Sequence, residues 1–390
     1  MLAMFASFGV TLIIVRTFGA EGLGKLSVVN AMLYYCLLIS GYGIEMYAVR
    51  EVAANRQPLS NMIPSLFAIR LGTAIIVYFT LLAFVFFLPA FKPQLDLFIV
   101  MGFTLLIVPF RTAWAAQAKG SSHILGLFNL ALELCYLSAV LIVALMPLAL
   151  INLAWSRVMV ELLVTGLLAV YVYQNFASFS KPFPLVQLKL MIRQAWPFTM
   201  YPLLRGLALG TDLILLSFFV SASSVGLYTG ASKLFFVLLT LSGSYIAVIY
   251  PRLSSISDEP LKSTYKRILH LYQVVLPIGL FGVLVLLQLS DFILVLLFGG
   301  EFLSASVSLG ILSVAFLANL SARHYQQLLL VTQNQQLDFK IVFRGTAIHM
   351  VAKLLLIPSW GIEGAALGTA IGEISMLLMY MLVVNRLAHK

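Results

Sequence analysis

Charged residues are scarce in this sequence. They make up 10% of the 390 residues, against about 25% in soluble domains. Hydrophobic residues make up 62%, against about 45–50%, and apolar runs of about 20 residues recur along the whole chain. The lack of charge excludes a soluble globular protein. The pattern predicts an all-α, polytopic membrane protein.

Cysteines and the common catalytic motifs are also few or absent. Cys36 and Cys135, the two cysteines, both lie inside apolar runs, so we expect neither a disulfide nor a metal site. The sequence contains no Walker loop, paired acidic motif, HExxH or nucleophile elbow. We therefore expect a protein that is not an enzyme and that binds no cofactor.

The net charge of +10 comes from Lys and Arg residues that fall on alternate loops between the apolar runs. They form no basic stretch interleaved with aromatic residues, so the charge predicts membrane topology and not a nucleic-acid partner. The basic loop at residues 252–267 is expected to lie along the anionic surface of membrane lipids.

The apolar runs predict twelve spans. These are residues 2–16, 26–49, 62–90, 97–118, 124–145, 148–174, 195–219, 225–250, 268–290, 302–322, 341–357 and 362–385. The first covers only about 22 Å of a hydrocarbon core about 30 Å thick, so we expect the true start to lie upstream of Met1. An even number of spans places both termini on one side. Fourteen basic residues fall on that side and three, Arg16, Lys25 and Lys92, on the other, which predicts that both termini are cytoplasmic.

A weak internal repeat relates the two halves. At an offset of 202 residues, seven positions match over 31, including Gly24 with Gly226 and Ser40 with Ser242. Paired halves are common in transporters, whose substrate path lies between them. We predict an N-terminal lobe at 1–174, a cytoplasmic linker at 175–194 and a C-terminal lobe at 195–390, with two pseudo-symmetric six-helix lobes around a central cavity.

Leaving aside the two residues at each end of a span, twelve charged residues lie inside the predicted spans, where each costs about 2.5–3.5 kcal/mol at the membrane centre. The cations are Arg70, Arg111, Arg157, Arg205, Lys233, Arg344 and Lys353, and the acids are Glu45, Glu133, Glu161, Asp212 and Glu373. They must face a watery cavity or one another. Arg157 and Glu161 are four residues apart and can pair locally, and Arg70 can alternatively reach the lipid headgroups.

Arg205 and Asp212 need partners elsewhere, because seven residues along a helix separate them by about 10 Å. A cavity lined by spans one, two, seven and eight is the expected place. Asp212, Glu133 and Glu373 are candidates for a proton or sodium site, with a structural, hydrogen-bonded role as the alternative.

Cations outnumber acids inside the spans, and arginine suits bidentate phosphate binding, so we expect an anionic, phosphate-bearing substrate. The candidate substrate-binding residues are Arg205, Arg111, Arg157, Arg70, Arg344 and Lys353. Span seven also contains Pro197, Pro202, Gly206 and Gly210, which predict either a helix that bends during transport or a static kink.

Several motifs, in order along almost the whole chain, resemble those of bacterial polysaccharide flippases of the O-antigen type. They are residues 15–26 (VRTFGAEGLGKL), 196–198 (WPF), 211–216 (TDLILL), 225–232 (VGLYTGAS), 297–302 (LFGGEF) and 360–370 (WGIEGAALGTA). The resemblance implies the multidrug, oligosaccharidyl-lipid and polysaccharide exporter superfamily, which has two six-helix lobes and does not hydrolyse ATP.

The same resemblance implies a function. Members of this branch move undecaprenyl-pyrophosphate-linked sugar units across the inner membrane for lipopolysaccharide and related polymers, by alternating access, and cation coupling is compatible with it. The expected partners are this lipid-linked oligosaccharide, membrane lipids and other polysaccharide assembly proteins. The alternatives are a drug or metabolite exporter of the same superfamily, a membrane-embedded polysaccharide polymerase, and a non-transporting scaffold.

Overall fold

The computed structural model describes residues 2–41, 43–146, 148–176, 185–254 and 261–388. Every regular element in these ranges is helical, as the apolar runs predict. The chain divides into two compact units, Met1–Leu203 and Leu204–Lys390.

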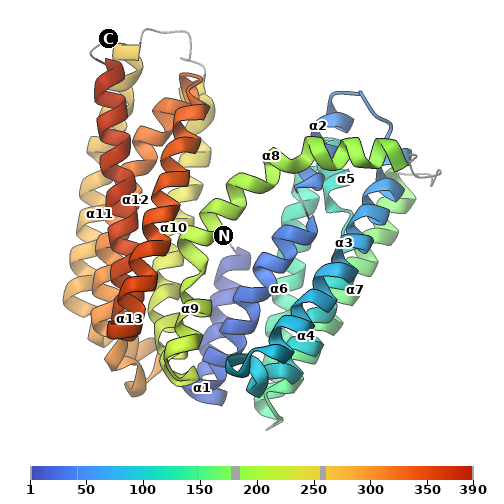
Figure 1. Ribbon diagram of the computed structural model, residues 1–390, viewed down its shortest axis with the longest axis horizontal. Coiled ribbons are helices and arrows are strands. Elements are labelled where there is room, and N and C mark those ends of the chain that lie inside the picture. The colour runs from blue at the N-terminus through green and yellow to red at the C-terminus, as the bar shows by residue number, and fades with distance from the viewer. Residues whose placement is uncertain (1, 42, 147, 177–184, 255–260, 389–390) are drawn as a thin grey trace. The chain divides into compact units, whose positions relative to one another are not determined.

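The first unit is a bundle of long helices with short connections. Its elements are α1 (Leu2–Gly41), α2 (Ile44–Ala53), α3 (Leu59–Phe87), η1 (Pro89–Gln94), α4 (Leu95–Ile107), η2 (Val108–Phe110), α5 (Ala113–Ala118), α6 (Ser122–Leu145), α7 (Ile151–Phe176) and the first part of α8 (Leu185–Gly210). Figure 1 shows α3, α4, α6 and α7 running side by side, and α1 packs against α3, α4 and α6.

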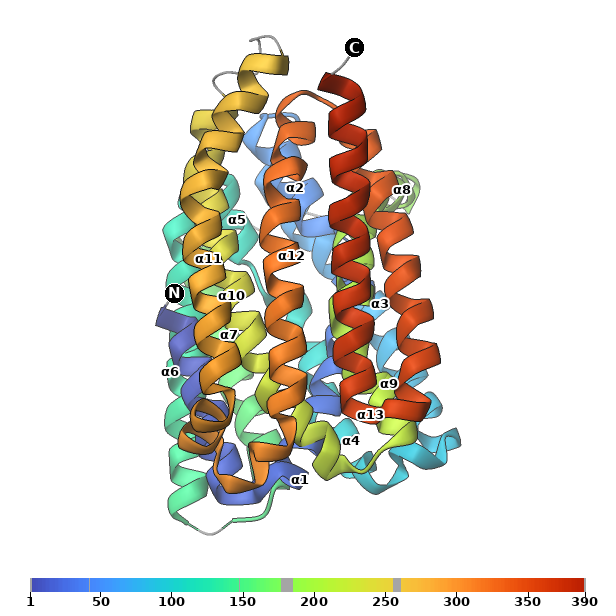
Figure 2. The ribbon, with the colours of Figure 1, turned by 90° about the vertical axis from the view of Figure 1, so that its left-hand side faces the viewer.

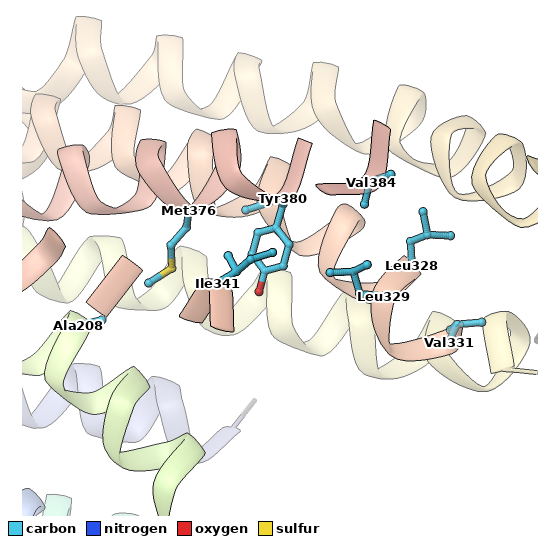
Figure 3. Packing of buried hydrophobic residues seen from close by; sticks show 9 residues of the cluster. Ala208, Leu328, Leu329, Val331, Ile341, Met376, Tyr380 and Val384 are labelled. Atoms are coloured by element: carbon cyan, nitrogen blue, oxygen red, sulfur yellow. The ribbon is translucent and has the colours of Figure 1, made fainter. Parts of the chain in front are cut away.

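The second unit contains the end of α8 and five further helices. They are α9 (Asp212–Phe219), α10 (Ala222–Ser254), α11 (Leu261–Phe298), α12 (Ser306–Val331) and α13 (Gln335–Ala388), with the short η3 (Gly300–Ala305) between α11 and α12. Figure 2 shows α11, α12 and the two arms of α13 lying side by side. A cluster of buried apolar residues from α8, α12 and α13, among them Ala208, Leu328 and Met376, packs their interface (Figure 3).

Two very long helices are each interrupted at a glycine. Gly19 in α1 has φ 65° and ψ −170°, and Gly361 in α13 has φ 52° and ψ −125°. Side-chain-bearing residues rarely adopt these conformations, so glycine permits the chain to reverse there. The Cα of Gly364 lies so close to the carbonyl of Leu356 that a Cβ would clash with its oxygen.

The count of spans follows from these interruptions. Nine helices of the described residues are long and apolar enough to cross a membrane, and the pair α8–α9, bent by 42°, forms a tenth. Dividing α1 and α13 at their glycines raises the number to twelve. Each of the twelve coincides with one predicted apolar run, which confirms the all-α, polytopic membrane fold.

The outer surface of the helices is apolar, as a hydrocarbon solvent requires. Large hydrophobic side chains on α3 and α6 are among the most exposed, for example Phe87 at 77% and Leu145 at 81%. A soluble protein of this size would not expose so many. The polar groups of the spans must therefore be compensated within the protein.

Two predicted connections can be compared with the structure. The predicted spans leave the polar stretch 323–340 as a loop. This prediction is wrong, because α12 continues to Val331 and α13 begins at Gln335. The stretch has the polar composition of a loop, yet some of its polar side chains, such as His324 and Gln327, are buried inside the unit. In the predicted linker 175–194, residues 177–184 lie outside the described ranges, whereas α8 already begins at Leu185, and Tyr47 on α2 donates a 2.8 Å hydrogen bond to Gln194 on α8.

Candidate functional site

Arg70 of the first unit is buried and paired. Its Nη1 lies 2.6 Å from Oε1 of Glu45 on α2, and the side chain of Arg70 is 3% exposed. The same Nη1 donates a 3.2 Å hydrogen bond to the carbonyl of Arg111. The alternative in which Arg70 reaches the lipid headgroups is therefore wrong.

A break in span four supplies that carbonyl. α4 ends at Ile107, η2 follows, and Arg111 is extended with ψ 108° before α5 begins at Ala113. The break leaves the Arg111 carbonyl without a helical partner, and Arg70 satisfies it. The Arg111 side chain turns to α7, where its Nε donates a 2.7 Å hydrogen bond to the buried Glu161, and its guanidinium lies 5.7 Å from the Phe128 ring.

Arg157 forms a third pair in the first unit. Its Nη1 lies 3.2 Å from Oε1 of Glu133 on α6, and its guanidinium lies 4.9 Å from the ring of Tyr136. The predicted local pair of Arg157 with Glu161 is wrong, because Glu161 is bonded to Arg111 instead. About a quarter of the Arg157 side chain is exposed, so it can contact a ligand while paired.

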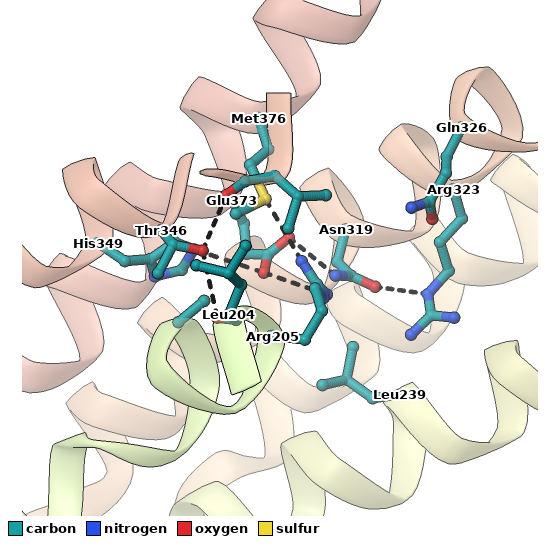
Figure 4. Close-up of polar contacts among 12 residues, drawn as sticks. Leu204, Arg205, Leu239, Asn319, Arg323, Gln326, Thr346, His349, Glu373 and Met376 are labelled. Carbon is teal, nitrogen blue, oxygen red and sulfur yellow. Dashed lines mark hydrogen bonds and ion pairs between the residues drawn. The ribbon is translucent and has the colours of Figure 1, made fainter. Parts of the chain in front are cut away.

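The second unit contains a polar cluster centred on Glu373, which is buried on α13 (Figure 4). Asn319 on α12 donates a 2.8 Å hydrogen bond to Glu373. Arg205 on α8 lies 3.8 Å from its other oxygen, and His349 lies 3.5 Å from that oxygen. Asn319 in turn accepts a 2.8 Å hydrogen bond from Nε of Arg323. Glu373 therefore joins helices α8, α12 and both arms of α13.

Asp212 lies in a second buried group at the break between α8 and α9. It forms an ion pair with Lys353 and accepts hydrogen bonds from the hydroxyls of Tyr228 and Thr369. Lys353 is fully buried and also donates to the carbonyl of Ala208. Arg205 and Asp212 thus each find a separate partner, as their spacing along the helix requires, and both partners lie on α13.

Close-packed glycines on the second arm of α13 make room for these polar side chains. A Cβ on Gly368 would come within 2.6 Å of the Lys353 side chain, and a Cβ on Gly372 would overlap the His349 ring. Small residues at four-residue spacing allow such close approach between membrane helices. The spacing of Gly364, Gly368 and Gly372 therefore builds the seam in which the buried charges lie.

Sequence reasoning missed three members of this polar core. The predicted loop 323–340 contains all three, Arg323, Gln326 and Asp338. In the structure Asp338 is buried and accepts hydrogen bonds from Gln326, at 3.0 Å, and from the hydroxyl of Tyr380. The sequence contains one feature that predicts their position. Asn319, Arg323 and Gln326 are spaced by three to four residues, which places them on one helical face.

The predicted substrate-binding residues fall into three groups. Arg111, Arg157 and Arg205 are paired yet partly exposed, and Arg344 lies exposed on α13 with no ion pair or hydrogen bond to the described residues. Arg70 and Lys353 are buried within their pairs. Among the described residues, no group of three or more His, Cys, Asp or Glu side chains could hold a metal ion.

Comparison with known families decides where this fold belongs. The profile of the family described as polysaccharide biosynthesis protein matches residues 1–257, about two thirds of the chain. The chain belongs to this family. No curated protein matches it.

Solved structures show the same fold. The lipid II flippase MurJ in an inward closed conformation is similar with a TM-score of 0.82 and 14% identity, over 98% of this chain and 86% of that chain. An inward-facing multidrug resistance MATE family transporter of the MOP superfamily has a TM-score of 0.78 and 13% identity, over 100% and 95% of the two chains. A mutant of the Vibrio cholerae MATE transporter VcmN has a TM-score of 0.62 and 16% identity, over 100% and 97%. This family member therefore has the fold of MOP-superfamily transporters.

Proposed function

We propose that this protein is a flippase that moves an undecaprenyl-pyrophosphate-linked oligosaccharide across the cytoplasmic membrane by alternating access. The family match supports a role in polysaccharide synthesis, and the likeness to a lipid II flippase supports a fold suited to a lipid-linked cargo. The observation that carries the proposal is that Arg111, Arg157 and Arg205 are partly exposed in a chain of the polysaccharide biosynthesis family.

The electrostatics of these arginines fit a pyrophosphate. Each is held by one carboxylate, and its exposed part retains free N–H donors in the planar arrangement that matches phosphate oxygens. Pairing holds each guanidinium in place, so little side-chain entropy is lost when an anion binds. A desolvated pyrophosphate would otherwise be costly inside a membrane.

A drug or metabolite exporter is the second candidate, since the MATE transporters share the fold. A cationic drug would need an acid that is not already neutralised. Glu133, Glu161, Asp212 and Glu373 each face a cation within their own unit. This pairing favours the anionic cargo.

The proposal includes a place in the cell. We propose that the protein acts without enzymatic chemistry in the inner membrane, with both termini cytoplasmic, and serves the assembly of O-antigen, lipopolysaccharide or a related polymer beside other polysaccharide assembly proteins. The asymmetry of basic residues between the two sets of loops supports this orientation.

The test compares cells with and without the gene for lipid-linked oligosaccharide and surface polysaccharide. We expect the complete lipid-linked unit to accumulate on the cytoplasmic side in cells without the gene, while the surface polymer is lost. An unchanged lipid-linked pool, together with increased sensitivity to small molecules, would favour the exporter.

A matched pair of arginine variants then tests the cargo site. Arg205→Ala should abolish export while the protein still inserts, because it removes a partly exposed guanidinium beside Glu373. Arg386→Ala serves as the control, since this arginine is exposed at the end of α13 in the same unit. Wild-type export by the Arg205 variant would contradict the assignment.

A further inference from the structure

The break in span seven leaves backbone carbonyls without the hydrogen bonds that a continuous helix would supply. α8 ends at Gly210 and α9 begins at Asp212, with a bend of 42° between them. The last carbonyls of α8 therefore lack helical partners. The Leu207 carbonyl accepts a 2.9 Å hydrogen bond from the Thr211 hydroxyl, and the Ala208 carbonyl accepts one from the Lys353 ammonium.

The oxygens at this break have the composition of a cation site. The Asp212 carboxylate and the Ala208 carbonyl both contact Lys353, and the hydroxyls of Tyr228 and Thr369 hold the second carboxylate oxygen. Hard cations such as alkali and alkaline-earth ions take carboxylate and carbonyl ligands of this kind. All five residues are buried, so solvent does not screen the carboxylate.

The Lys353 ammonium stands where such a cation would sit. It bridges the carbonyl at the C-terminal end of α8 and the carboxylate in the first turn of α9. The helix dipoles favour this arrangement, because a C-terminal end attracts a cation and an N-terminal end attracts an anion. One ammonium neutralises the one carboxylate, so a second cation would meet an unscreened positive charge.

The position of Lys353 is also fixed by packing. Gly368 on the other arm of α13 lies very close to Lys353. A Cβ built on this glycine would come within 3.1 Å of the Cα of Lys353 and within 2.6 Å of the Cγ of Lys353. The side chain has no exposed route to solvent, since its relative exposure is 0%. Lys353 is thus held against the break by a neighbouring helix.

We propose that Lys353 is a tethered cation that fills the Asp212 site in place of a metal ion, so that this site binds no sodium in the native protein. This inference goes beyond the proposed function, which leaves the role of cations open, and it does not depend on the identity of the cargo. Removal of the ammonium should turn the same oxygens into a site for a monovalent cation. Lys353 then acts as a positioning residue that joins the two halves of span seven.

The test measures the thermal stability of the purified full-length protein in detergent. Each variant is heated in sodium chloride and, separately, in an equal concentration of N-methyl-D-glucamine chloride, whose cation is too large for the site. We expect the wild type to have the same Tm in both. Lys353→Ala should have a lower Tm without sodium and regain several degrees with it, because a ligand that binds only the folded state stabilises that state.

Two further variants show where the sodium acts. Asp212→Asn combined with Lys353→Ala should lose the response to sodium, since the carboxylate is gone. Lys340→Ala, an exposed lysine on the same helix, is the matched control and should behave as the wild type. Methylammonium chloride should restore the Tm of Lys353→Ala, because this small amine reproduces the lost ammonium.

Three results would overturn the inference. One is a rise in the wild-type Tm with sodium that Asp212→Asn abolishes, which would show that the native site binds the metal; this measurement stands even where Lys353→Ala fails to fold. Another is a Lys353→Ala protein that folds but gains nothing from sodium or methylammonium. The third is a sodium response of Lys353→Ala that persists when Asp212 is replaced.

Discussion

Gly372 offers a direct test of the glycine seam that admits the buried polar side chains. A Cβ built at Gly372 would overlap the His349 ring, which is fully buried. We expect Gly372→Ala to destabilise the second unit, because the ring, its contact with Glu373 or the helix itself must shift.

The magnitude follows from a comparison with Gly282 on α11. A Cβ at Gly282 would meet no atom within 4 Å, so Gly282→Ala carries the helix-propensity gain of about 1 kcal/mol without a clash. Overpacking costs about 1–3 kcal/mol. Propensity cancels in the difference between the two variants, which should therefore be about 1–3 kcal/mol, equivalent to roughly 2–12 °C in Tm for a unit of this size.

The assay is the midpoint of thermal unfolding in detergent, followed as loss of the monodisperse peak in size-exclusion chromatography. The double variant His349→Ala/Gly372→Ala provides the internal check. It should be less destabilised than the sum of its single variants, since residues in contact are not additive and the smaller side chain leaves room for the Cβ. Equal Tm values for Gly372→Ala and Gly282→Ala would refute the packing argument.

Three further predictions concern buried charges and backbone. Glu45→Gln should destabilise the first unit by about 3–5 kcal/mol and Arg70→Gln by less. The first change leaves a guanidinium that is 3% exposed without its carboxylate, whereas the second leaves a carboxylate that is 41% exposed without its guanidinium. Chemical denaturation measures both variants, and the reverse order of stability would contradict the reasoning. Gly361→Ala should cost about 1–3 kcal/mol, since φ 52° with ψ −125° suits only glycine, and a Tm equal to that of the wild type would contradict it. Tyr380→Phe should cost about 1.5–3 kcal/mol by removing a hydrogen bond to the buried Asp338, and Asp338→Asn in the same background should then cost little, a coupling that a double-mutant cycle measures.

Membrane helices could be identified from the sequence because hydrocarbon imposes a one-dimensional rule. Any segment that crosses the membrane must be apolar for about 20 residues, so all twelve spans were recognisable, including the two pairs that glycines join into α1 and α13. The sequence also indicated which charges need partners. The family resemblance rests on short motifs in order, and the family profile agrees with it over residues 1–257.

The choice of partners could not be predicted. Arg157 and Glu161 have the spacing of a local ion pair, yet Arg157 pairs with Glu133 on α6 and Glu161 pairs with Arg111 at the break before α5. Which residue of another element comes within reach depends on side-chain packing over the whole bundle. The break at Arg111 likewise decides which carbonyl Arg70 bonds.

The polar stretch after span ten shows the same limit. Arg323 and Asp338 have the composition of a loop, and only the tertiary structure reveals that α12 and α13 enclose them. Lys353 and Asp212 were each recognised as charges that need compensation, but their meeting at the break in span seven depends on how the two arms of α13 fold back at Gly361. Hydrophobicity alone determined that the described residues form twelve apolar spans, whereas the packing of helices determined which charges neutralise one another and which remain partly exposed.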